Sequence, residues 1–93
     1  MATKTLKTLE RGIDLLFLFS HNRPALSLRE ISVALDIPQS TAYRLLATCR
    51  KKQVIVRDPV TRKYVLDAGL LRLQAAIQAN LDITKIAIPS LED

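Results

Sequence analysis

Residues 27–46 read SLREISVALDIPQSTAYRLL, and this stretch decides the fold. Ser27 and Glu30 form an S-x-x-E capping box: the Ser27 hydroxyl can accept the N–H of Glu30, while the Glu30 carboxylate can accept the N–H of Ser27. A short helix is therefore predicted over residues 28–36. It must end before Pro38, because proline disrupts a helix that continues across it.

A second helix is predicted over residues 39–52, directly after Pro38, whose missing N–H would have no partner in the first turn of a helix. One face of this helix carries apolar residues at i, i+3, i+4 and i+7 spacing, namely Ala42, Leu45, Leu46 and Cys49. The apolar positions of the preceding helix are Leu28, Ile31, Ala34 and Leu35. Ile37 is expected to fill the angle between the helices, which is the helix-turn-helix layout.

The segments on either side of this pair predict a further helix and a hairpin. Residues 5–20 have helical spacing and end before Pro24, with apolar positions at Leu6, Leu9, Ile13, Leu16 and Phe17. β-branched and aromatic residues at 54–57 and 64–66 predict two antiparallel strands. The turn between these strands starts with Asp-Pro and carries Arg62 and Lys63 at its tip.

Residues 68–81 predict a last helix that is almost uncharged, with apolar residues at Leu70, Leu73, Ile77 and Leu81. The apolar side chains of such a helix need to be buried against another protein surface. A chain of 93 residues buries only about 60–65% of the surface that it exposes when unfolded, so a partner chain would stabilise it. We therefore expect a homodimer that forms through residues 68–81 and the helix at 5–20.

Composition and charge narrow the class of protein. The chain carries a net charge of +5, and its positive charge is local: residues 39–63 hold the single acid Asp58 against Arg44, Arg50, Lys51, Lys52, Arg57, Arg62 and Lys63. Such a local field admits a nucleic-acid partner. The sequence shows no signal peptide and no apolar stretch of membrane-spanning length, so we expect a soluble protein of a reducing compartment, the cytoplasm.

The sequence offers no arrangement for catalysis, metal binding or a cofactor. His21 is the only histidine and Cys49 the only cysteine, too few for a metal site with several imidazole or thiolate ligands in one chain. Cys49 lies on an apolar stripe and is interpreted as a core residue. No Ser-His-Asp set, paired carboxylates or glycine-rich phosphate loop is present. We therefore expect neither an enzyme nor a cofactor.

Three strings carry a resemblance to a known family: LERGID at 9–14, PQSTAYRLL at 38–46 and RDP at 57–59. Together with the order of elements, they resemble the N-terminal domain of IclR-family transcriptional regulators. Two positions depart from that family's pattern. Asp36 stands in the turn where the family often has glycine, and Arg62 stands at the wing tip where glycine is common.

The resemblance implies a winged helix-turn-helix fold, mainly α-helical, with a three-helix core, a small two-stranded antiparallel wing and a C-terminal linker helix. Residues 1–67 would be the DNA-binding domain and residues 68–81 the linker helix. Residues 82–93 would begin an effector-binding domain that is otherwise absent, and a small-molecule effector would bind only there.

In this geometry the start of the second helix of the pair enters the major groove, where all four base pairs differ in their donors and acceptors. The helical wheel and the resemblance agree on Gln39, Thr41 and Arg44 as candidates for base edges. Ser40 and Tyr43 are expected to bind phosphate. Two recognition helices about 34 Å apart in a dimer would read a palindromic or near-palindromic operator.

Several of these side chains also have a purely structural interpretation. Ser27 caps its helix and could also bind a phosphate, because a helix N-terminus attracts anions. Arg62 and Lys63 could reach a minor groove or flanking phosphates, or simply occupy an exposed turn. Cations in a last helical turn are favoured by the helix dipole alone, which applies to Arg50, Lys51 and Lys52.

A winged helix can also serve as a protein-interaction or scaffold module, since a fold does not determine a function. Apolar or acidic side chains would then be expected on the open face of the second helix. That face instead carries Gln39, Ser40, Thr41, Tyr43 and Arg44. DNA binding is therefore the preferred interpretation.

Overall fold

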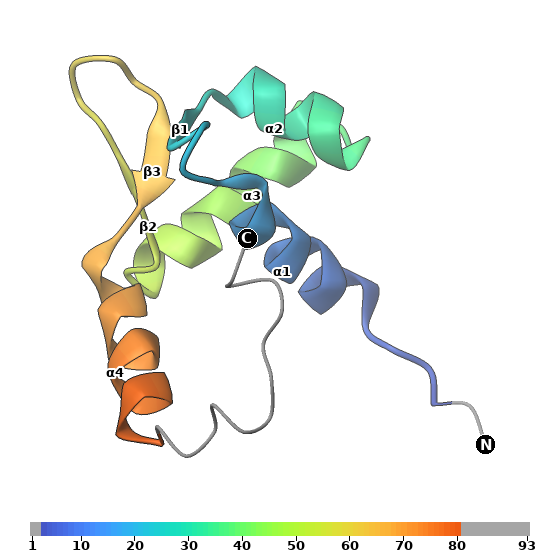
Figure 1. Ribbon diagram of the computed structural model, residues 1–93. Helices are drawn as coiled ribbons and strands as arrows, with labels where there is room; N and C mark the ends of the chain where they lie inside the picture. Colours follow the sequence, from blue (N-terminus) through green and yellow to red (C-terminus); the bar gives the residue numbers. More distant parts are fainter. Residues whose placement is uncertain (1–2, 81–93) are drawn as a thin grey trace.

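The computed structural model describes residues 3–80 and contains four α-helices and a small antiparallel sheet in that range (Figure 1). The elements in chain order are α1 (Lys7–Leu18), β1 (Ala25–Leu26), α2 (Leu28–Leu35), α3 (Gln39–Lys51), β2 (Ile55–Arg57), β3 (Tyr64–Leu66), a 3-10 turn (Ala68–Leu70) and α4 (Leu71–Ala79). The predicted winged helix-turn-helix architecture is confirmed. The segment predicted to open a further domain, 82–93, lies outside the described residues.

The sheet has the strand order β1-β3-β2. β2 and β3 form the predicted hairpin, with Val56 opposite Val65. β1 adds a third strand to the predicted two-stranded wing by pairing Leu26 with Tyr64 on the other edge of β3. A strand of two residues has too little alternation to be recognised from sequence, and it exists here because β3 offers it a free edge.

The core lies where α1, α2 and α3 meet the sheet. Its buried apolar residues are Leu15, Phe19, Leu26, Ile31, Ile37, Ala42, Leu46, Ile55 and Tyr64. Ile37 is 7% exposed and fills the angle between α2 and α3, as predicted. The predicted apolar stripe of α3 also faces inward, because Leu45 and Cys49 pack against this core.

Most of the apolar positions predicted for α1 lie outside the core, and of these positions Leu16 packs against it. Leu15 is fully buried and Phe19 nearly so, whereas Phe17 is 80% exposed and Leu6, Leu9 and Ile13 are also exposed. α1 has apolar residues on two sides, and its spacing alone does not tell which side meets the other helices. The side that begins at Leu6 is therefore left as an apolar surface.

The predicted inner face of α2 needs one correction. Ala34 is exposed, and Ser32 is buried in its place. The Ser32 hydroxyl donates to the carbonyl of Ile37 at 2.5 Å, so its burial leaves no unpaired polar group. A serine that is satisfied in this way can occupy an interior position that hydrophobicity alone would assign to alanine.

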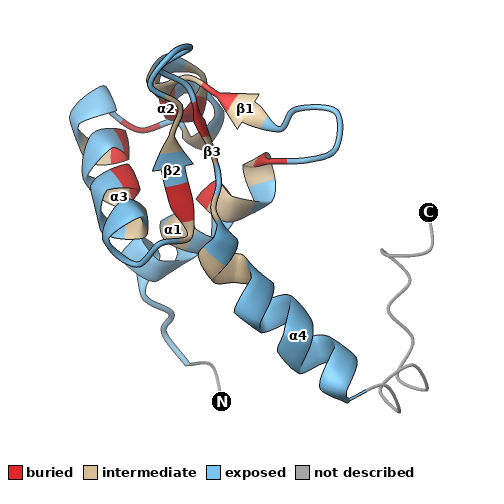
Figure 2. Ribbon diagram, turned by 90° about the vertical axis from the view of Figure 1, so that its left-hand side faces the viewer, coloured by how far each residue is buried: buried red, intermediate tan, exposed pale blue. Residues whose placement is uncertain are grey.

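α4 leaves the body of the molecule, and all of its residues are exposed (Figure 2). The joint at its base consists of two backbone hydrogen bonds: Asp67 N–H donates to Val54 and Gly69 N–H to Gln53, both at 2.9 Å. These bonds tie the 3-10 turn before α4 to the segment between α3 and β2. No helix in the described part of the chain is long and apolar enough to cross a membrane.

Candidate nucleic-acid interface

α3 presents a polar front because its opposite side is held in the core. Ala42 and Leu46 are fully buried, and they fix the rotation of the helix about its axis. The predicted contact residues Gln39, Ser40, Tyr43 and Arg44 are exposed, and Thr41 is half-buried at the edge of the same surface. The structure therefore brings the five predicted α3 residues together on one accessible face.

The turn before α3 is held by hydrogen bonds that set the angle between α2 and α3. Asp36 adopts a left-handed conformation, with φ 55° and ψ 51°. The N–H of Ile37 donates to the carbonyl of Ser32 at 3.1 Å, and the Ser32 hydroxyl returns a bond to Ile37. A left-handed backbone favours glycine, and aspartate is among the side chains that tolerate it. This geometry explains why a glycine is common at position 36 in the resembling family.

The predicted capping box is present at the start of α2. The Ser27 hydroxyl accepts the N–H of Glu30 at 3.1 Å, and the Glu30 carboxylate accepts the N–H of Ser27 at 2.8 Å. This backbone hydrogen bond is the main reason that the pKa of Glu30 lies below its ordinary value. Because the Ser27 hydroxyl accepts in the cap, its own hydrogen can be donated to another acceptor, such as a phosphate.

Hydrogen bonds within the turn hold the wing tip in a defined shape. Asp58 N–H donates to the Lys63 carbonyl at 2.8 Å, and Arg62 N–H to the Asp58 carbonyl at 2.7 Å. The Asp58 carboxylate accepts the N–H of Val60 at 2.9 Å, and this bond is the main cause that lowers the pKa of Asp58. The exposed side chains of Arg62 and Lys63 therefore project from a turn of defined shape.

Arg57 has a structural role that sequence reasoning missed. Its Nε donates to the Arg62 carbonyl at 3.1 Å, and its guanidinium lies 5.5 Å from the centre of the Tyr64 ring. These contacts tie the last strand pair of the hairpin to the turn at the wing tip. Arg57 and Tyr64 are cross-strand partners, so the hairpin register would have placed them together.

The cations near the interface carry no ion pairs. Between residues 3 and 80, the one salt bridge joins Arg23 to Glu30 at 3.1 Å. Arg44, Arg62 and Lys63 are therefore available to an external anion. Arg50, Lys51 and Lys52 are exposed as well, but they lie at the far end of α3, about 18 Å from its start.

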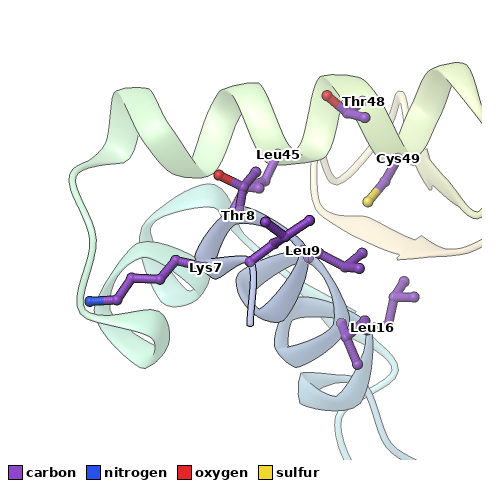
Figure 3. Close-up of a pocket in the computed structure, with 10 residues that line it drawn as sticks. Lys7, Thr8, Leu9, Leu16, Leu45, Thr48 and Cys49 are labelled. Atoms are coloured by element: carbon purple, nitrogen blue, oxygen red, sulfur yellow. The ribbon is translucent and has the colours of Figure 1, made fainter. Parts of the chain in front are cut away.

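An apolar groove of about 650 Å³ lies between α1 and α3 (Figure 3). Its walls include Leu6, Leu9, Ile13, Leu16, Leu45 and Cys49, with Thr8 and Thr48 among its polar residues. Half-burial here raises the pKa of the Cys49 thiol by desolvation, which keeps it in the unreactive protonated form. No cluster of His, Cys, Asp or Glu suited to a metal ion occurs in the described part of the chain.

Comparisons with known proteins give one consistent family. Residues 8–59 match the model of the IclR helix-turn-helix domain. The HTH-type transcriptional repressor AllR of Escherichia coli is 30% identical over 89 residues, which cover 96% of this chain and 33% of AllR. This chain thus spans about a third of the length of the curated relatives that it matches.

Solved structures agree. An IclR family transcriptional regulator from Brucella abortus superimposes with a TM-score of 0.77 and 31% identity, over 90% of this chain and 32% of that one. An IclR-type regulator from a Silicibacter species gives a TM-score of 0.76 at 26% identity, over 82% of this chain and 30% of that one. The matched proteins are transcriptional regulators rather than enzymes.

Proposed function

Because this chain belongs to the IclR family of helix-turn-helix transcriptional regulators, we propose that it reads a specific DNA operator with α3 in the major groove. The observation that carries this proposal is the exposed polar front of α3, which is held away from the core by buried Ala42 and Leu46. Side chains on such a front can reach base edges without any rearrangement of the domain.

Each side chain of the front suits a particular contact. Gln39 can pair with adenine and Arg44 with guanine in two-bond geometry, and the methyl group of Thr41 can contact that of thymine. Ser40 and Tyr43 can donate hydroxyl hydrogens to phosphates, and Ser27 keeps a hydrogen for the same purpose. In these assignments the residues that read the base sequence are Gln39, Thr41 and Arg44. The residues that position the protein on the DNA backbone are Ser27, Ser40 and Tyr43.

The wing supplies a second contact beside the recognition helix. Arg62 and Lys63 are exposed, free of ion pairs among residues 3–80, and mounted on a braced turn. They would bind flanking phosphates or the adjacent minor groove. This contact would add affinity that depends on salt and carries little sequence information.

The acting form is proposed to be a homodimer. α4 exposes Leu71, Leu73 and Ile77 by at least half of their surface, and α1 contributes the apolar groove. An exposed helix and an exposed groove on the same chain can cover each other across a two-fold axis. Two recognition helices about 34 Å apart would then select a palindromic operator.

The proposed division of labour follows the elements. Residues 1–67 form the DNA-binding unit, and residues 68–81 form the linker, of which the structure describes the part up to residue 80 as a 3-10 turn and α4. An operator-binding protein of this family would act in the cytoplasm, on the nucleoid. A small-molecule effector would bind outside the winged domain.

Selection of bound sequences from a random duplex pool tests this function directly. The expected result is one enriched motif with two related half-sites, together with a log–log salt slope of clearly negative sign. Failure to enrich any sequence, with a salt slope near zero, would favour the scaffold-module alternative instead. Enrichment of a single half-site would keep DNA binding and reject the palindrome.

A further inference from the structure

A second, smaller cleft lies beside the recognition face. It encloses about 190 Å³ and is lined by Thr8 of α1 together with Thr41, Arg44, Leu45 and Thr48 of α3. Thr41 and Arg44 belong to both the cleft and the polar front, so the two surfaces are continuous. Figure 3 shows Thr8 directly below α3, next to Leu45.

The cleft is rich in hydrogen-bond donors that have no acceptor. Thr48 is not one of them, because its hydroxyl already donates to the Arg44 carbonyl at 3.0 Å. In the described part of the chain, the hydroxyls of Thr8 and Thr41 and the guanidinium of Arg44 make no hydrogen bond, and none of the lining residues is acidic. Two hydroxyls and one cation with these free hydrogens suit an anion with several acceptor oxygens.

We propose that this cleft binds a phosphate of the DNA backbone, with Thr8 as a donor from α1. The inference rests on the proposed function, since the cleft opens beside the face that would enter the groove. Donors from two helices would fix one phosphate against the body of the domain, while α3 reads the bases. The start of α1 thereby becomes a third DNA-contacting element, beside α3 and the wing.

Arg44 gains a defined place from this arrangement. Arg44 lines the cleft and also belongs to the polar front. A phosphate in the cleft would hold the planar, two-pronged side chain in a position from which it can still reach a base edge. Thr8 is thus a ligand of a phosphate that lies next to the base-reading side chain.

The test compares Thr8→Val, which removes the hydroxyl at nearly constant shape, with Thr8→Ser, which keeps it. Thr48→Val is the matched control, since its hydroxyl is already used within α3. Affinity is measured for the selected operator and for a mixed-sequence duplex. Thr8→Val is expected to weaken binding to both by about tenfold, the size expected for a hydrogen bond to a charged group.

The other readouts separate this contact from alternatives. Thr8→Ser and Thr48→Val should bind as the wild type does, and no variant should change the salt slope, because no charge is removed. Thr8 also lines the apolar groove, so sedimentation must show the same association state for Thr8→Val and wild type. A changed association state would assign the effect to the groove and overturn the proposal.

Duplexes with a single neutral methylphosphonate locate the phosphate itself. At one position the neutral linkage should weaken Thr8→Val less than it weakens the wild type, because the Thr8 contact is already lost while Thr41 and Arg44 still face that phosphate. Additive losses at every position would refute the contact. So would wild-type affinity in Thr8→Val; a wild type that binds no duplex would instead reject the proposed function itself.

A titration with inorganic phosphate distinguishes the two sources of the anion. Saturable amide shifts at Thr8 and Thr41 that vanish in Thr8→Val would show a cleft that also takes free phosphate. A DNA effect without such shifts would assign the cleft to the polymer backbone. Both results support a phosphate ligand. They differ in whether the cleft binds free phosphate by itself or binds phosphate only as part of the DNA backbone.

Discussion

Arg44 is the residue on which the proposed base recognition depends most. It is exposed on the polar front of α3 and has no ion-pair partner among the described residues. A guanidinium in this position can pair with guanine through two parallel hydrogen bonds, a geometry that lysine cannot reproduce. Recognition and charge can therefore be separated at this one side chain.

Arg44→Ala is expected to lower operator affinity by about 1–3 kcal/mol and to relax the preference at one base pair. Arg44→Lys should keep the salt slope of the wild type yet lose the same preference, because it keeps the charge and not the two-bond geometry. Competition binding against singly substituted operators measures both effects. An unchanged preferred site in Arg44→Ala would disprove the role in base reading.

Arg62 combines a useful side chain with a costly backbone conformation. Its φ is 66°, in the left-handed region where a Cβ atom is unfavourable. The hydrogen bonds of the turn hold Arg62 in this conformation. In return, the side chain places an exposed positive charge at the wing tip. This strain explains why the resembling family commonly has glycine at the wing tip.

Arg62→Gly is expected to raise the free energy of unfolding by about 0.5–1 kcal/mol, since relief of the strain exceeds the extra flexibility of the unfolded chain. The same variant should weaken all duplexes alike and reduce the salt slope by about 1. Arg62→Ala is the control, because it loses the charge and keeps the strain. Equal stability of the two variants in urea unfolding would contradict this account.

At the scale of elements, the joint between the winged domain and α4 depends on a close backbone approach. A Cβ atom on Gly69 would lie 2.2 Å from the carbonyl oxygen of Gln53, which accepts the Gly69 N–H. This oxygen belongs to the backbone, so it cannot move aside as the end of a flexible side chain could. Gly12 within α1 is the opposite case, with nothing within 4 Å of a built Cβ atom.

Gly69→Ala is therefore expected to destabilise the domain by about 1–3 kcal/mol, the usual range for overpacking. Gly12→Ala should stabilise it by about 0.5–1 kcal/mol, because alanine is the better residue within a helix. Urea unfolding of both variants gives the comparison. Equal effects of the two alanines would show that the joint is not as tight as the backbone distance implies.

The capping box of α2 should make stability depend on pH. A folded-state pKa of Glu30 below the ordinary value means that the carboxylate stabilises the fold fully above about pH 4.3. That contribution is lost as the pH falls through the lowered pKa.

Glu30→Gln can keep the cap without a charge. Its urea midpoint is therefore expected to fall less than that of the wild type when the pH is lowered from about 7 to about 3. Asp58, whose pKa is also lowered, is present in both proteins and cancels in the comparison. If the urea midpoints of the two proteins fell by the same amount as the pH is lowered, the Glu30 carboxylate would contribute nothing to the acid sensitivity.

At the scale of the whole molecule, the proposed DNA-contacting surface and the main exposed apolar surface lie on different elements. The polar front and the wing carry Arg44, Arg62 and Lys63, while the apolar groove and α4 carry exposed leucine and isoleucine. A monomer that leaves such a groove uncovered has a reason to associate. DNA binding and pairing would thus use separate surfaces of the same small domain.

Leu73→Glu is expected to prevent pairing, because an unpaired carboxylate in an apolar contact is strongly unfavourable. Gln74→Glu on the same helix adds the same charge and is the matched control. Sedimentation should give a monomer only for Leu73→Glu, with weaker binding to the palindrome and wild-type binding to an isolated half-site. A strictly monomeric wild type, free and on its operator, would rule out the dimer.

The sequence alone determined those features that rest on contacts between near neighbours in the chain. The capping box needs only Ser27 and Glu30, and the stripe of α3 needs only helical spacing, so both were predicted and both are present. The hairpin follows from two short runs and a turn between them. These features also suffice to place Gln39 and Arg44 on one open face.

Tertiary structure alone decided which side of α1 faces inward, that β1 pairs with β3, and that Thr8 lies beside Arg44. Each of these joins residues distant in sequence, and the choice between alternatives depends on packing summed over several elements. Helical spacing repeats equally well on either side of α1. Only contact with α2 and α3 makes one side the core and leaves the other as a groove.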